Sequence, residues 1–259
     1  RQYKSDAKPQ GVIDLGANDD KTHVFNTQNN FYYIPNEAFQ GQFDLLAGEE
    51  EPYIAFPAKV TGNDCFSSRP TLNDWYETVK LNYGIDYQGG HRYYDPNTWY
   101  KMKDILLYWA GKNIDGFRCD MAEMVPVEFS EWVIPQVKNQ FPDIIFIAEV
   151  YNPAEYRHYI FNGKFDYLYD KVGLYDTLRD VTCGRKAACE ITKCWQQVSD
   201  IQKHMLNFLE NHDEQRIASE FFASDGRAGI PAVIVSATMH NNPFMVYFGQ
   251  ELGAKGMDK

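Results

Sequence analysis

Acidic side chains end three separate segments of the chain, at Asp120, Glu149 and Asp213. Arg118 stands two residues before Asp120, and His212 stands directly before Asp213. An arginine beside a carboxylate keeps it ionised and fixes its direction, as a carboxylate nucleophile requires. Glu149 ends an apolar run, where poor solvation favours the protonated form that a general acid needs. A nucleophilic carboxylate and a proton-donating carboxyl group are what glycoside hydrolysis uses.

The segment around Asp120 indicates how these groups are positioned. Apolar residues before it repeat with helical spacing and end at Gly111, and they are Met102, Ile105, Leu106, Trp109 and Ala110. A short strand is predicted at 115–119, and Pro126 is expected to open the next helix. On that strand Arg118 and Asp120 leave the same face. Taken alone, the pair is equally compatible with an ordinary structural ion pair.

The segments downstream repeat this order of strand and helix. Strands are predicted at 144–148, 165–169, 205–209 and 244–248, the first buried on both faces. The helix from 125 to 141 is expected to break at Pro135, and a later helix is expected to bury Ile230, Val233, Ile234 and Ala237. The acidic residues are 29 and 64 residues apart, which fits one and two units of a (β/α)8 barrel at about 31 residues each. Barrel active sites form where the strands end.

Composition limits the possible classes of function. The 259 residues carry a net charge of −11, so nucleic acid is not an expected partner. No apolar run of about 18 residues is present, so no segment is expected to insert into a membrane. Aromatic residues make up 15% of the chain, which suits a cleft that stacks sugar rings, although large core residues explain most of that content.

The first part of the chain differs from the rest. Residues 1–94 have little helical periodicity and many turn-forming residues, so we expect an irregular subdomain there, with short strands at 31–35 and 54–57. Residues 95–259 then form the second region, the C-terminal part of the barrel. Asp14, Asn18, Asp19 and Asp20 could bind calcium through oxygen atoms, but their spacing favours a turn built on side-chain hydrogen bonds.

Several short motifs resemble those of the α-amylase family of glycoside hydrolases. They are G-F-R-C-D at 116–120, I-A-E at 147–149 and E-N-H-D at 210–213, in the family's order. V-Y-F-G-Q-E at 246–251 resembles the last barrel strand, and Leu81-Asn82 resembles the L-N pair of the inserted subdomain. The resemblance implies a partial (β/α)8 TIM barrel of about strands four to eight, preceded by that subdomain.

The resemblance also implies a role for each site residue. Asp120 would be the nucleophile and Glu149 the general acid/base, while Asp213 would hold the 2- and 3-hydroxyl groups of the sugar. Arg118 would orient Asp120, and His212 would hydrogen-bond the sugar. These roles imply retention of anomeric configuration. The implied substrate is starch or a maltooligosaccharide, cleaved at α-1,4 bonds.

The sequence departs from the family pattern in two ways. Where the family often has Lys-His after the nucleophile, this chain has Glu123 and Met124. The family's first motif, its first three strands and its C-terminal β-sandwich are not found, so we expect the chain to be a fragment of a longer enzyme and inactive alone. A structural calcium ion and a secreted or cell-envelope location are expected from the resemblance, and the oligomeric state is open.

Two other functions fit the same residues. The site could transfer a glucan to a sugar instead of water, as an α-glucan transglycosylase does. The chain could also be an inactive relative that binds glucan, but a binding protein has no need of all three carboxylates.

Overall fold

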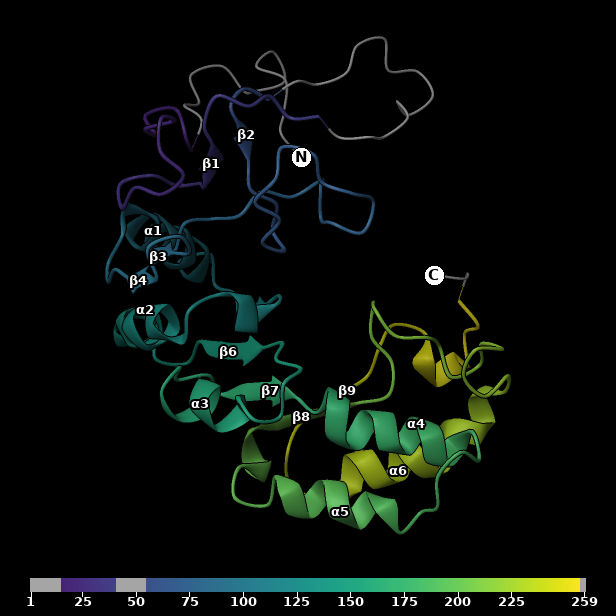
Figure 1. Ribbon diagram of the computed structural model, residues 1–259. Coiled ribbons are helices and arrows are strands. Elements are labelled where there is room, and N and C mark those ends of the chain that lie inside the picture. The colour runs from purple at the N-terminus through teal and green to yellow at the C-terminus, as the bar shows by residue number, and fades with distance from the viewer. Residues whose placement is uncertain (1–14, 41–54, 257–259) are drawn as a thin grey trace. The chain divides into compact units, whose positions relative to one another are not determined.

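The computed structural model describes residues 15–40 and 55–256 (Figure 1). The chain divides into two compact units, Arg1–Tyr108 and Trp109–Lys259. The boundary predicted between residues 94 and 95 stays a prediction. Among the described residues, every helix is too short or too polar to cross a bilayer.

The N-terminal unit contains two small antiparallel strand pairs: β1 (Tyr33–Ile34) with β2 (Ala58–Lys59), and β3 (Ile85–Asp86) with β4 (His91–Arg92). The strand predicted at 54–57 is misplaced, because pairing begins at Ala58; Ile54 lies outside the described residues. Asn82, fully buried, donates to the carbonyl oxygens of Asn26 and Asn29 at 2.8 and 3.0 Å. The Asn82 side chain therefore links its own loop to the loop that contains Asn26 and Asn29 through hydrogen bonds.

Helix α1 (Asn97–Ala110) ends immediately before Gly111, as predicted. Its apolar residues are less buried than their spacing indicates. Ile105 and Trp109 are 45% and 52% exposed, so the predicted stripe is not a buried face within the described residues.

Five parallel strands form one sheet in the second unit, in the order β5-β6-β7-β8-β9 (Figure 1). They are β5 (Gly116–Cys119), β6 (Ile145–Ala148), β7 (Tyr167–Tyr169), β8 (Met205–Phe208) and β9 (Phe244–Met245). The connections contain α2 (Val127–Gln140), α3 (Tyr156–Phe161), α4 (Asp176–Thr182), α5 (Glu190–Gln197) and α6 (Ile230–Thr238). Parallel neighbours in chain order with helical crossovers are the pattern of a (β/α)8 barrel, so the predicted partial barrel is confirmed.

Strand register separates the two faces of this sheet. Phe117 pairs with Phe146 on one face, and their ring centres are 5.3 Å apart. On the other face Phe208 belongs to the buried core cluster, where Tyr175 stacks on it at 5.0 Å. Arg118 pairs in register with Ile147, which packs against that same cluster. Side chains therefore pack on both faces of the sheet, and this packing fixes the strand ends from which the candidate site projects.

Helix α2 runs unbroken through Pro135, so the predicted break is wrong. Pro135 lies on the exposed side of the helix, where the carbonyl that loses its hydrogen-bond donor can be solvated. The opposite side is held in place by buried apolar residues, including Val133 and Val137. Burial of that side outweighs one missing backbone hydrogen bond.

Three other predictions about these elements are wrong in part. In α6 the buried residues are Ala232 and Ser236, while Ile230 and Ile234 are 52% and 55% exposed. The helix is apolar on almost every side, so periodicity does not distinguish its faces. Strand β6 is not buried on both faces throughout, because Ile145 is 38% exposed. Strand β9 ends at residue 245 instead of 248.

A buried acid follows β7. Asp170 is 5% exposed, and its Oδ1 accepts the backbone N–H of Leu174 at 2.9 Å. This bond caps the short π-helical turn Lys171–Tyr175. Burial raises the pKa of Asp170 to about 6, from 3.8, although the Leu174 N–H opposes the change.

We expect Asp170→Asn to stabilise the protein at pH 7 and to leave it unchanged at pH 4. Folded Asp170 binds its proton more tightly than the unfolded chain does, so its contribution is most favourable near pH 4 and is lost as pH rises to about 6. Asparagine keeps the oxygen acceptor without the charge, so the gain in unfolding free energy is about 3 kcal/mol at pH 7. Melting temperatures at both pH values measure it, with exposed Asp143→Asn as control. A loss of stability at pH 7 contradicts this expectation.

Candidate active site

Arg118, on β5, brings the three predicted carboxylates together. Its Nη1 hydrogen-bonds Oδ1 of Asp120, while its Nη2 lies 2.9 Å from Oε1 of Glu149 and 3.9 Å from Oδ2 of Asp213. Its guanidinium also lies 5.5 Å from the ring centre of Tyr169. Burial opposes its charge, but the bond to Asp120 and the charge of Glu149 leave the pKa of Arg118 raised. Arg118 is therefore a fixed cation at the centre of the cluster.

Glu149 is the most buried of the three acids, at 3% exposed. The backbone N–H of Met121 donates to its Oε2 at 2.8 Å, and the hydroxyl of Tyr151 donates to its Oε1 at 2.6 Å. Together with Arg118, these groups surround the carboxyl with donors. The apolar setting predicted for Glu149 is therefore wrong in part, because the carboxyl is buried but polar groups line it.

The backbone after Asp120 produces one of these contacts. Met121 has φ 43° and ψ 45°, a left-handed backbone conformation that residues other than glycine rarely adopt. The strand ends at this turn, and the Met121 N–H points to Glu149 instead of continuing the ladder. The next N–H, of Ala122, returns to the ladder and donates to the carbonyl of Glu149 at 3.0 Å. An unfavourable conformation is thus retained where it orients a site carboxyl.

The loop after β8 carries Asp213 and His212. Asn211, 2% exposed, accepts the backbone N–H groups of Asp213 and Glu214 at 2.8 and 2.7 Å. Glu210, 1% exposed, accepts the N–H of Ile217 at 2.7 Å and so closes the loop. Nε2 of His212 lies 3.1 Å from Oδ2 of Asp213. The E-N-H-D motif therefore contains two buried residues that shape the loop and two accessible residues that it presents.

Exposure differs sharply among the five predicted residues. The side chains of Asp120, His212 and Asp213 are 74%, 54% and 39% exposed, whereas that of Glu149 is 4% exposed. Solvent, and hence a ligand, can reach Asp120 directly. The arrangement offers one open carboxylate beside one held carboxyl, with a cation that contacts both.

Sequence reasoning missed several residues of this site. Tyr151 and Tyr169 lie outside the motifs, yet Tyr151 hydrogen-bonds Glu149 and the ring of Tyr169 lies against the Arg118 guanidinium. Glu123 stands where the family often has lysine, and its Oε2 accepts the N–H groups of Tyr151 and Asn152 at 3.2 and 3.1 Å. The signal for Tyr151 was its position, two residues after Glu149 at a strand end.

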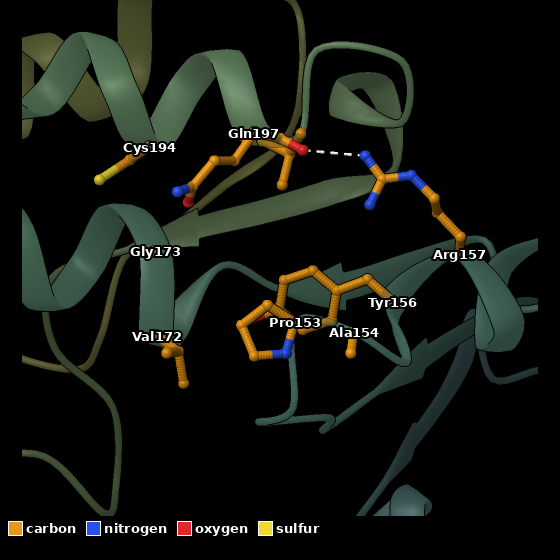
Figure 2. Close-up of a pocket in the computed structure, with 9 residues that line it drawn as sticks. Pro153, Ala154, Tyr156, Arg157, Val172, Gly173, Cys194 and Gln197 are labelled. Atoms are coloured by element: carbon orange, nitrogen blue, oxygen red, sulfur yellow. Dashed lines mark hydrogen bonds between the residues drawn. The ribbon is translucent and has the colours of Figure 1, made fainter.

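A separate pocket of about 440 Å³ lies between α3, α5 and the turn after β7 (Figure 2). Figure 2 shows Arg157 crossing toward α5, where it donates to the carbonyl of Gln197 at 2.8 Å. None of the five predicted site residues lines this pocket. The candidate chemistry therefore belongs to the open ends of the strands and not to this cavity.

Two of the residues considered for calcium, Asp19 and Asp20, already accept several hydrogen bonds in the structure. Asp19 accepts hydrogen bonds from Asn30, Phe31 and Tyr33, and Asp20 accepts them from its own neighbours in the loop. Asp14 lies outside the described residues. Within the described part of the chain, His, Cys, Asp and Glu form no group of three suited to a metal. Calcium binding therefore stays a prediction.

Known proteins share this sequence and fold. The chain is 26% identical over 159 residues to an alpha-1,4-glucan:maltose-1-phosphate maltosyltransferase of Cereibacter sphaeroides. This match covers 61% of this chain and 25% of that protein. It is 28% identical over 243 residues to Alpha-amylase 2 of Dictyoglomus thermophilum, covering 89% of this chain and 42% of that protein. A solved cyclic alpha-maltosyl-(1→6)-maltose hydrolase from Arthrobacter globiformis shares the fold, with a TM-score of 0.60 at 20% identity over 77% of this chain and 41% of that one.

The chain thus spans less than half the length of each of these proteins. The family model described as the alpha amylase catalytic domain matches residues 62–259. That match contains Asp120, Glu149 and Asp213 with the strands that position them. The chain belongs to the alpha-amylase family.

Proposed function

We propose that these residues form the catalytic carboxylate cluster of a retaining α-glucan hydrolase that cleaves α-1,4 bonds in starch or maltooligosaccharides. The observation that carries the proposal is that one guanidinium, of Arg118, contacts both Asp120 and Glu149. Retaining glycosidases place their two carboxyl groups about 5–5.5 Å apart, and inverting ones about 6.5–9.5 Å apart. Because both acids contact the same guanidinium, we assign them the shorter separation.

In this proposal each site residue acts in a defined step of the reaction. Glu149 donates its proton to the glycosidic oxygen while an Oδ of Asp120 attacks C1, so that the C1–O bond breaks and a glycosyl–Asp120 ester forms. Glu149, now ionised, takes a proton from the water that attacks C1 and releases Asp120. Asp213 and His212 hold the sugar hydroxyls during both steps. Arg118 balances the negative charge of the carboxylate cluster while the ester intermediate exists.

Glucan transfer is the second candidate, and it differs only in the acceptor. A sugar hydroxyl would replace water in the second step, with Glu149 as the base for either. Similarity to proteins named maltosyltransferases favours this alternative for part of the chain. An inactive glucan-binding relative is the third, and the presence of all three acids disfavours it.

Incubating the natural full-length chain with a maltooligosaccharide and separating the products tests these alternatives. Shorter oligosaccharides alone support the hydrolase, and longer ones support the transferase. Cellooligosaccharides, which have β-linkages, serve as the control and should stay intact. No change in the maltooligosaccharide contradicts both enzymatic proposals and leaves the binding protein. The predicted secreted or cell-envelope location belongs to the same proposal, because starch is too large to be taken up whole.

A further inference from the structure

Lys171 lies next to the site and contacts residues of the loops that follow three strands of the sheet. Nζ of Lys171 lies 3.1 Å from Oδ1 of Asp176 and 3.3 Å from Oε1 of Glu214. The same Nζ lies 5.7 Å from the ring centre of Tyr151. Tyr151 follows β6, Lys171 follows β7 and Glu214 follows β8. A single ammonium group therefore links the loops after three neighbouring strands.

Lys171 is held as a cation by the groups that face it. Burial opposes its charge, but Glu214 and Asp176 leave the pKa of Lys171 raised. Its Nζ also lies 5.6 Å from the ring centre of Tyr175. Glu214 in turn accepts the hydroxyl of Tyr175 at 3.0 Å and lies 3.7 Å from Nη1 of Arg179. The described contacts of Lys171 thus combine two carboxylates with two aromatic rings.

The contact with Tyr151 leads to the candidate acid. The Tyr151 hydroxyl donates to Oε1 of Glu149 at 2.6 Å, and burial and this bond together raise the pKa of Tyr151. The negative charges of Asp213 and Glu214 act on the same hydroxyl and in the same direction. A cation near the phenol ring acts the opposite way, because it draws electron density from the oxygen and makes the O–H a better donor.

We propose that Lys171 is a positioning residue that acts on Glu149 through Tyr151, by fixing the ring and strengthening its hydrogen bond to the carboxyl. The inference rests on the proposed role of Glu149 as general acid/base. Such a carboxyl must lose and regain a proton in every cycle, and a donor to it stabilises its ionised form. Loss of the Tyr151 donor should therefore disfavour the ionised carboxylate, and the pH profile of the reaction should report that change.

The pH dependence of kcat/KM in the natural full-length chain tests this. Tyr151→Phe is expected to move the alkaline limb of the profile up by about one pH unit, the effect of one hydrogen bond to a charged group. Lys171→Met should move it the same way by roughly half a unit. Lys171→Arg keeps the charge and should restore most of the wild-type profile. In the Tyr151→Phe background, Lys171→Met should add no further shift.

Two results overturn the proposal: an unchanged limb in Lys171→Met, or a full additional shift in the Tyr151→Phe background. Lys193→Met is the matched control, because the described partner of Lys193 is Glu190, three residues away on α5, and it should leave the profile unchanged. If Lys171→Met does not fold, Lys171→Gln removes the charge and keeps the hydrogen-bonding capacity. Titration of the Glu149 carboxyl by ¹³C NMR, assigned with Glu149→Gln, needs no turnover. It separates a wrong positioning role from a wrong proposed function.

Discussion

Asp120→Asn is expected to lower kcat on maltooligosaccharides by about 10⁴-fold or more, as loss of a catalytic group does in other hydrolases. Asparagine has the size of aspartate but lacks the negative charge that attacks C1, so no glycosyl ester can form. The side chain is 74% exposed, so the fold should not depend on its charge. The melting temperature should therefore stay within about 2 °C of the wild-type value.

Asp143→Asn makes the same chemical change just before β6, at the other end of the sheet, and is the matched control. It should leave kcat unchanged. Initial rates on a maltooligosaccharide and on an activated maltoside measure both variants. Wild-type activity in Asp120→Asn removes Asp120 from the role of nucleophile, whatever else the site does.

Glu149→Gln is expected to show a dependence on the leaving group that Asp120→Asn does not show. Glutamine has no proton to donate, so cleavage of a natural glucan should slow by about 10²–10⁴-fold. An activated maltoside with an acidic leaving group needs no proton, and its first step should be nearly unaffected. The ester on Asp120 should then accumulate, because Glu149 is also the base for the second step.

Azide separates this outcome from general damage to the site. It attacks C1 without a general base, so it should restore turnover of the activated maltoside in Glu149→Gln and release an α-glycosyl azide. It should do nothing for Asp120→Asn. Equal losses on both substrates, with no effect of azide, contradict the assignment of Glu149 as acid/base.

The order of the barrel segments was predictable from the sequence because each strand is a short apolar run between turn signals. Strands β5 to β8 lie at or within the predicted ranges, and Asp120 and Glu149 follow β5 and β6 directly. The alternation of strand and helix then fixes a parallel sheet. Pattern alone did not determine the buried side of α6 or the continuity of α2 at Pro135, because tertiary packing decides both.

The site was predictable as a set of acids but not as a network. Parallel strands present their ends at one edge, so three strand-end acids were expected to meet near Arg118, as they do. The donors to Glu149 come from a left-handed backbone at Met121 and from the Tyr151 hydroxyl. No regular spacing of residues in the sequence predicts either of these two donors. Lys171 contacts Tyr151 across two strands, a relation that appears only when the sheet is assembled.

The most direct test of the proposed chemistry is the anomeric configuration of the first product, followed by ¹H NMR as the natural full-length chain acts on an α-maltooligosaccharide. Attack by Asp120 and then by the acceptor inverts C1 twice, so the α-anomer should appear first and mutarotate only later. This holds for hydrolysis, and a transfer product should likewise carry an α-linkage. Initial release of the β-anomer contradicts the paired roles of Asp120 and Glu149.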